Sequence, residues 1–146
     1  MIRSTLIAVG LFAHLSAAET LLVPEQYTNV SDAINSSSPD DLILVDSNHI
    51  DEGEWPLPHN LRISGNSAEE KFLVIATNDL FSVSESPHEI HLENIEIQAD
   101  AEIQGSGKIS ISNCVFDGTS TQIQCCLFST CGSIVIEDST FKNFVR

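Results

Sequence analysis

The stretch "ISISNCVFDG" (Ile109–Gly118) decides the fold, because "IVIEDSTFKN" (Ile134–Asn143) repeats its pattern later in the chain. Both read apolar, any residue, apolar, any residue, Asn or Asp, two further residues, and then Phe. Apolar residues at alternate positions place their side chains on one face of a strand. Asn and Asp tolerate the left-handed backbone conformation better than most residues. The pattern therefore predicts a short strand that ends in a sharp bend, after which Phe116 and Phe141 return to the same interior.

Three further copies lie upstream, and the five together recur every 19 to 29 residues. They are "LILVD" (Leu42–Asp46), "LRISG" (Leu61–Gly65) and "IHLEN" (Ile90–Asn94). The first and third residues of the copies are expected to face the interior: Leu42 and Leu44, Leu61 and Ile63, Ile90 and Leu92, Ile109 and Ile111, Ile134 and Ile136. The fifth residues are expected to be left-handed: Asp46, Gly65, Asn94, Asn113 and Asp138. Ile97 takes the place of the returning Phe after Asn94.

This recurrence predicts an all-β fold, a solenoid of about five coils whose strands stack in parallel, since hairpins would reverse the chain. Equivalent residues then form ladders, with aliphatic side chains inside and Asn or Asp at the bend. Phe72–Thr77, Leu80–Ser84 and Thr121–Ser129 are predicted to be strands of the other walls. An antiparallel β-sandwich is the alternative, because it also contains short alternating strands. The longer consensus of leucine-rich repeats is absent.

A short helix is predicted before the first copy. Val30, Ala33 and Ile34 fall at helical spacing, with Asn29 or Ser31 available as the N-cap. Such a helix would cover the open end of the first coil, which otherwise exposes a hydrophobic cross-section. We therefore expect residues 19–41 to form an N-terminal capping segment and residues 42–146 to form the parallel β-helix.

Residues 1–18 have the features of a signal peptide. Arg3 precedes the apolar run Leu6–Leu15, and the small residues Ser16, Ala17 and Ala18 follow. An N-terminal membrane anchor or a buried helix is the alternative interpretation. Because no later run is long enough to span a bilayer, the mature chain is expected to be secreted or displayed at the cell surface, without a membrane span.

The chain is strongly acidic, with 21 Asp and Glu, 6 Lys and Arg, and a formal net charge of −15. This charge argues against nucleic acid or anionic lipid as a partner, since both bind basic surfaces. The acidic residues are spread along the chain rather than gathered in a tail, which is typical of a solvated surface.

The chain has 4 cysteines, Cys114, Cys125, Cys126 and Cys131. Export would allow disulfides, and three full pairings are possible, between which the sequence does not choose. Zinc is a weaker interpretation, since no pair of Cys has the usual ligand spacing. Asn29 and Asn35 lie in N-glycosylation sequences, which matter in a eukaryotic host.

"VSDAINSSSPDDLILVDS" (Val30–Ser47) resembles the entry segment of right-handed parallel β-helix proteins of the pectin-lyase-like superfamily. The two stretches quoted first resemble that superfamily's repeat, in which the Asn residues stack at a turn. The resemblance covers Val30–Phe144 and implies a right-handed β-helix. The superfamily includes lyases, hydrolases, phage tailspikes and non-catalytic surface proteins. The chain is most similar in character to the polymorphic outer-membrane-type surface proteins and adhesins, whose Phe-x-x-Asn motif Phe141–Phe144 approximates.

The candidates for catalysis are few. A pectate lyase needs Ca²⁺-binding carboxylates and a strong base, and Arg62 is the only internal Arg of the predicted β-helix. Asp41, one coil earlier, is a candidate to stack beside it, and Arg146 is the last residue. The pectin-degrading hydrolases need several converging Asp, whereas Asp40–Asp41 is the only Asp pair. We therefore expect no catalytic residues.

Two further candidates concern metals and sugars. His88 and His91 could bind a metal, but their spacing in a strand places them on opposite faces, so a solvated pair is favoured. Trp55 could stack on a sugar ring, although a Trp beside two Pro more often packs over a coil edge.

Acidic and thiol side chains complete the set. Asp51, Glu52 and Glu54 could bind Ca²⁺ weakly, but hydrated surface acids are the default. Cys114 and Cys126 have no base at a recognisable offset, so reactive thiols are not indicated. No catalytic, metal-binding or cofactor-binding residue is assigned.

The function expected from these features is that of an exported, non-catalytic surface module that binds or adheres to a protein or glycan ligand. The alternatives are a fragment of a carbohydrate-active enzyme, either a polysaccharide lyase or a hydrolase, and a structural coat component. Because no closing helix follows Phe141–Phe144, the β-helix is expected to be truncated at its C-terminal end and to self-associate through its last coil.

Overall fold

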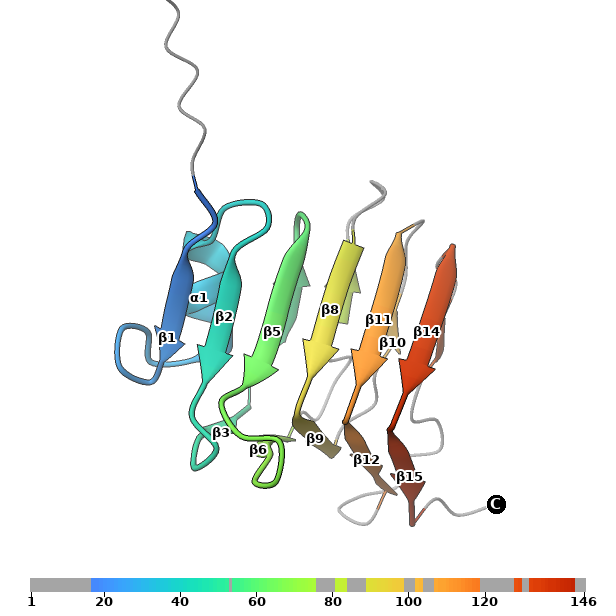
Figure 1. The fold of residues 1–146 in the computed structure, drawn as a ribbon. Coiled ribbons are helices and arrows are strands. Elements are labelled where there is room, and N and C mark those ends of the chain that lie inside the picture. The colour runs from blue at the N-terminus through green and yellow to red at the C-terminus, as the bar shows by residue number, and fades with distance from the viewer. Residues whose placement is uncertain are drawn as a thin grey trace, which may run out of the picture.

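The computed structural model describes residues 17–52, 54–75, 81–83, 89–98, 102–103, 107–118, 128–129 and 132–143. Its strands pair in parallel and stack as a β-solenoid of about 4 turns, with one short helix near the N-terminus (Figure 1). The predicted fold class is therefore confirmed, and the antiparallel sandwich is excluded. The number of turns is slightly lower than the expected five.

The coils form three walls. The six-stranded sheet has the order β1 (Thr20–Val23), β2 (Leu42–Val45), β5 (Leu61–Gly65), β8 (Glu89–Glu93), β11 (Lys108–Ser112) and β14 (Ser133–Glu137). The five-stranded sheet has the order β3 (Ile50–Asp51), β6 (Phe72–Ile75), β9 (Ile95–Gln98), β12 (Val115–Asp117) and β15 (Thr140–Lys142). The third wall contains the pairs β4 (Trp55–Leu57) with β7 (Phe81–Val83), and β10 (Glu102–Ile103) with β13 (Phe128–Ser129).

The strands predicted for the other walls are found as β6, β7 and β13. The last of these is shorter than predicted, because it covers only Phe128–Ser129 of Thr121–Ser129. Residues 121–127 lie outside the described residues. In the five-stranded sheet, Phe116 pairs with Ile97 on one side and with Phe141 on the other, as predicted. The rings of Phe116 and Phe141 are stacked, with centroids 4.7 Å apart.

The interior rows run across the six-stranded sheet as predicted from the second copy onward. The register pairs Leu61 with Ile90 and Ile63 with Leu92, and both rows continue through β11 to β14. Each of these residues from β5, β8 and β11 is no more than 2% exposed. The alternating pattern therefore identified the buried face of these strands correctly.

The prediction for the first copy is wrong by one residue. Ile43 pairs with Ile63 and is 0% exposed, as is Val45. Leu42 and Leu44 lie half-buried on the outer face. All four residues of β2 are apolar, so their alternation cannot select a face, and a shift of one residue turns every side chain over.

Three of the five predicted left-handed residues are confirmed. The φ angles are 59° at Asn94, 48° at Asn113 and 49° at Asp138. Asn113 Nδ2 donates to Asn94 Oδ1 at 2.7 Å, which is the expected ladder at the bend. Left-handed φ angles also occur at Asp40 and Asn143, which the repeat did not indicate.

The prediction is wrong for Asp46 and Gly65, neither of which has a left-handed φ angle. Asp46 turns the chain with its side chain, because Oδ1 accepts hydrogen bonds from the backbone N of Asn48 at 2.8 Å and from its Nδ2 at 3.1 Å. Gly65 is required for a different reason. A Cβ there would lie 2.5 Å from the backbone O of Asn94 in the next coil.

The predicted helix is α1 (Val30–Ser36). Asn29 is its N-cap, and its Oδ1 accepts a hydrogen bond from the backbone N of Asp32 at 2.8 Å. Val30, Ala33 and Ile34 are buried, and the helix packs on β4, β1 and β2. The capping segment also contains β1, which was not predicted, because four residues are too few to show a period.

The cysteines and the N-terminal residues are only partly within the described part of the chain. Cys114 is a free thiol in the core, whereas Cys125, Cys126 and Cys131 lie outside the described residues. Burial raises the pKa of Cys114 to about 11, so its thiol is unreactive near neutral pH. No helix among the described residues is long and apolar enough to cross a membrane. Residues 1–16, and with them most of the predicted signal peptide, lie outside the described part, so that prediction is not tested.

Candidate functional site

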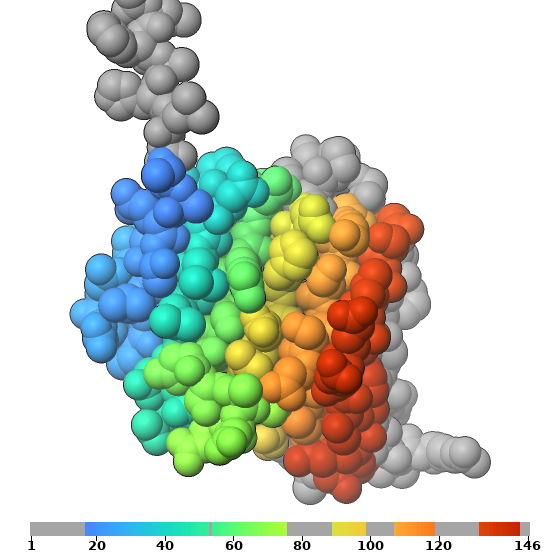
Figure 2. Space-filling model, in the orientation of Figure 1, coloured from blue at the N-terminus to red at the C-terminus, as the bar shows by residue number. Residues whose placement is uncertain are grey.

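The outer face of the six-stranded sheet presents ordered rows of side chains. Because successive residues of a strand point to opposite faces, outward residues of paired strands lie side by side. Figure 2 shows these strands as adjacent bands over the front of the molecule. The two central rows contain Leu42, Arg62, His91, Ser110 and Val135, and Leu44, Ser64, Glu93, Ser112 and Glu137. The face is apolar at β2 and polar from β5 to β11.

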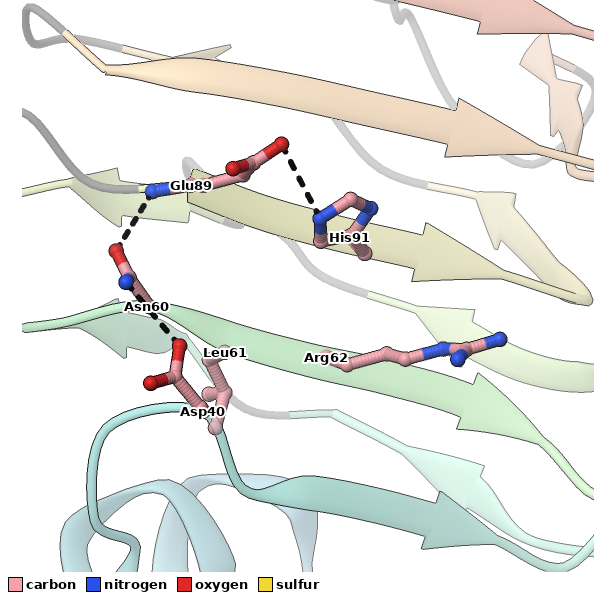
Figure 3. A pocket seen from close by; sticks show the side chains of 6 residues that line it. All are labelled: Asp40, Asn60, Leu61, Arg62, Glu89 and His91. Carbon is pink, nitrogen blue, oxygen red and sulfur yellow. Dashed lines mark hydrogen bonds and ion pairs between the residues drawn. The ribbon is translucent and has the colours of Figure 1, made fainter. Parts of the chain in front are cut away.

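A shallow groove of about 200 Å³ lies at the amino ends of β5 and β8. Six residues line it: Asp40, Asn60, Leu61, Arg62, Glu89 and His91 (Figure 3). Five of the six side chains are polar or charged. The lining thus offers carboxylate and amide acceptors beside nitrogen donors, which suits a polar ligand.

Asn60 fixes the shape of the groove. Its Nδ2 donates to Asp40 Oδ1 at 3.1 Å, and its Oδ1 accepts from the backbone N of Glu89 at 2.9 Å (Figure 3). Its own backbone O accepts from the backbone N of Asp40 at 2.9 Å. One amide therefore joins the entry points of three neighbouring strands, β2, β5 and β8.

The charges of the outer face pair with one another across the strands. Arg62 lies 2.6 Å from Glu93, and Lys108 lies 2.7 Å from Glu89. His91 Nε2 lies 3.5 Å from the carboxylate of Glu89. The hydrogen bond from Lys108 lowers the pKa of Glu89, so Glu89 is a carboxylate at neutral pH. These pairs are solvent-exposed, and exposed pairs contribute only about 0–1 kcal/mol to stability.

Asp41 lies beside Arg62 as predicted, but only the backbones of the two residues are in contact. The backbone N of Arg62 donates to the backbone O of Asp41 at 3.1 Å. The carboxylate of Asp41 is buried and accepts hydrogen bonds from the backbone N of Glu19 and of Ser38, both at 2.7 Å. The Asp40–Asp41 pair is therefore divided between the groove and the interior.

The constellation that a lyase or hydrolase needs is not assembled by these residues. Arg62, the candidate base, is held by Glu93, which the sequence did not single out as its partner. Arg146 lies outside the described residues. Within the described part of the chain, no three His, Cys, Asp or Glu side chains gather closely enough to hold a metal ion. His91 lies exposed on β8, and His88 is not among the described residues.

Trp55 is buried and cannot stack on a sugar ring. It is 0% exposed, and its ring centroid lies 6.3 Å from that of Phe72. Its Nε1 donates to Asp51 Oδ1 at 3.0 Å. The alternative interpretation, in which Trp55 packs over a coil edge, is the one that agrees with the structure.

Asp51 is the candidate residue for which the prediction from the sequence is wrong. The sequence predicts a hydrated surface acid here, as at Glu52 and Glu54, but Asp51 is only 1% exposed. Besides Trp55, it accepts a hydrogen bond from the backbone N of Val30 at 2.8 Å. Asp51 therefore attaches the start of α1 to the first coil. Glu52 and Glu54 are exposed, as expected.

A second, smaller hollow of about 90 Å³ lies at the carboxyl ends of β1, β2 and β5. Glu25, Asp46 and Asn66 supply its polar wall, and Leu22, Val23 and Leu44 supply its apolar wall. Hydrogen bonds from Asn48 lower the pKa of Asp46. The carboxylate of Asp46 is thus already engaged by Asn48 and Asn66. The hollow has three polar lining residues, whereas the groove has five.

Comparison of the chain with protein-family models, with curated proteins and with solved structures found no match.

Proposed function

We propose that this chain is an exported, non-catalytic β-helix module that binds a protein or glycan ligand along the outer face of its six-stranded sheet. The observation that carries the proposal is the combination of ordered outward rows with the polar groove at their amino ends. We also propose that it belongs with the surface proteins of the pectin-lyase-like superfamily, on the resemblance of its repeat and entry segment.

The rigidity of the face supports a binding role. Parallel strands are spaced about 4.8 Å apart, so each row presents its side chains at a regular interval. Arg62, Glu89 and Lys108 are already held by ion pairs, and Asn60 by hydrogen bonds. Because these side chains are already ordered in the free protein, binding of a ligand costs less side-chain conformational entropy.

The chemistry of the groove favours a ligand rich in hydroxyl or amide groups. Asp40 and Glu89 offer acceptors, while Arg62 and His91 offer donors, all within one hollow. Carbohydrate hydroxyls and peptide amides both donate and accept, so either can use this mixture. The engagement of Arg62 by Glu93 argues against a role for Arg62 as a free base.

The proposal is tested with a glycan and protein array, probed with the chain purified from an exporting host. Arg62→Gln removes a charge from the groove. Lys142→Gln is the matched control, because Lys142 is also an exposed cation in an ion pair but belongs to the five-stranded sheet. We expect at least a tenfold loss of affinity with Arg62→Gln and none with Lys142→Gln.

The other functional classes give different results in the same experiments. Cleavage of a uronate polymer, seen as new reducing ends or unsaturated products, would replace the binding proposal with the enzyme alternative. Equal loss with the two substitutions would remove the six-stranded sheet as the binding face. A chain that binds nothing on either array would favour the structural coat component.

A further inference from the structure

The two edges of the six-stranded sheet are treated differently. At β1 the outer edge is occupied by the chain itself. The backbone N of Leu22 donates to Gln26 Oε1 at 2.9 Å, and the backbone O of Leu22 accepts from the backbone N of Gln26 at 2.9 Å and of Tyr27 at 3.1 Å. Another strand cannot add to this edge without displacing the turn.

At the opposite edge, β14 is the last of the described strands of the sheet. Ile136 continues the interior row of Ile111, and Phe141 continues that of Phe116. Ile111 and Phe116 are each 1% exposed, but Ile136 is 38% and Phe141 is 43% exposed. Val135, on the outer face of β14, is 41% exposed. Among the described residues, apolar side chains of the interior rows and a strand edge with no further paired strand therefore coincide on one coil.

We propose that a second copy of this chain covers this coil, with the two β14 strands paired antiparallel about a twofold axis through Val135. A head-to-tail arrangement would need the β1 edge, which is closed. An arrangement that joins the two C-terminal coils uses the same surface on both copies and ends at a dimer.

The sequence of β14 suits this pairing. With Val135 on the axis, Ile134 of one copy lies opposite Ile136 of the other, and Ser133 lies opposite Glu137. The interior rows thus continue from one copy into the next, and no charged residue faces its own counterpart. A twofold axis through a residue requires a strand with an odd number of residues, and β14 has 5. Its two Ile residues lie on the inner face, on either side of the axis.

The charge of the chain predicts how the dimer responds to salt. Each copy carries a formal net charge of −15, so the two copies repel one another at long range. Salt screens this repulsion, with a Debye length of about 10 Å at 0.1 M. We therefore expect the dimer to tighten as the salt concentration is raised.

Sedimentation equilibrium tests the proposal on the chain purified from an exporting host, with its N-terminus determined by mass spectrometry. We expect a dimer at tens of micromolar, and a monomer with Ile136→Lys under the same conditions. Ile50→Lys is the control, because Ile50 is an exposed apolar residue on β3, at the opposite end of the solenoid. It should leave the dimer unchanged, and circular dichroism should show that both variants are folded.

The axis is tested by a cross-link. Residues directly opposite in an antiparallel pair have Cα atoms about 4.5 to 5.5 Å apart, a distance that a disulfide can span. Val135→Cys should therefore give a covalent dimer on mild oxidation, joined through the two introduced thiols as identified in the linked peptide. Ser110→Cys, one strand inward in the same row, should not.

Three outcomes would overturn the proposal: a monomer at tens of micromolar, open-ended oligomers, or a dimer that Ile136→Lys does not dissociate. None of them bears on the binding proposal, which depends on the outer face of β5 and β8.

Discussion

The two ends of the solenoid are built from the same kind of coil but are finished differently. The N-terminal end carries α1, whose buried residues Val30, Ala33 and Ile34 lie over the first coil. The last described coil, at the opposite end, presents Ile136 and Phe141, two residues of the interior rows that are exposed. The comparison teaches that a repeat encodes the stacking of coils but not their termination, because each repeat only provides for a neighbour on both sides.

Termination at the N-terminal end depends on residues outside the repeat. Asp51 accepts a hydrogen bond from the backbone N of Val30, and Ser31 Oγ donates to the backbone O of Glu54. Gln26 occupies the strand edge. These polar contacts satisfy backbone groups that the end of a sheet or helix would otherwise leave unpaired, which is why the closed end needs specific side chains and not only apolar ones.

The largest effect is expected from an acidic substitution in the interior row that contains Ile111 and Ile136. Ile111→Asp would bury a charge without a partner, which costs several kcal/mol, and should abolish folding. Ile136→Asp, in the same row but 38% exposed, should leave a folded chain. Far-ultraviolet circular dichroism and urea denaturation distinguish the two variants. If both unfold the chain, the C-terminal coil is as buried as the middle of the solenoid.

The second prediction concerns the attachment of α1. Asp51→Ala leaves the backbone N of Val30 and the Nε1 of Trp55 without their acceptor. Because each buried unsatisfied donor costs about 1–3 kcal/mol, we expect a loss of about 2–4 kcal/mol in the free energy of unfolding. Glu52→Ala, at the exposed neighbouring position, is the control and should have little effect. Similar losses in urea denaturation for both variants would contradict the role of Asp51.

The third prediction tests the bend that the repeats share. Asn113 has a φ of 48°, and a β-branched residue is strained in this conformation. Asn113→Val should therefore lower the free energy of unfolding by about 1–2 kcal/mol. Asn113→Gly should be milder, since Gly adopts this φ without strain, although it loses the hydrogen bond to Asn94. Equal losses for the two variants would show that the left-handed backbone is not what selects Asn at this position.

The smallest effect is expected from the ion pair near the open end. Lys142 Nζ lies 3.1 Å from Asp117 and 3.7 Å from Glu96, and the hydrogen bond to Asp117 raises the pKa of Lys142. A raised lysine pKa contributes stability below the ordinary lysine pKa, and this contribution is lost as pH rises through the folded value. Lys142→Gln should remove that alkaline pH dependence and be nearly neutral in high salt. A loss of stability that salt does not reduce would contradict a solvent-exposed pair.

How far the sequence predicts this fold depends on the contrast between neighbouring residues. In β5 and β8, Arg62 and His91 alternate with aliphatic residues, so the buried face was evident. In β2, "LILV" contains no polar residue, and the register set by pairing with β5 decided the face. Burial against the neighbouring coil, not the local pattern, therefore decides which face of β2 is buried.

The candidate site was predictable only in part, because it joins residues of different coils. The outward direction of Arg62 follows from its strand, but its pairing with Glu93 depends on the register between β5 and β8. The burial of Asp51 depends on Val30, a residue on a separate element. Contacts of this kind have no signature in a single sequence, since neither residue is unusual where it stands.

Hydrogen exchange measured by mass spectrometry tests the difference between the two ends most directly. We predict that the amides of β1 and α1 exchange slowly at every protein concentration, because the chain itself closes that end. The amides of β14 should exchange fast in dilute protein and become protected as the concentration rises. Protection of β14 that is already complete in dilute protein, or a concentration dependence at β1 instead, would contradict the assignment of one closed and one open end.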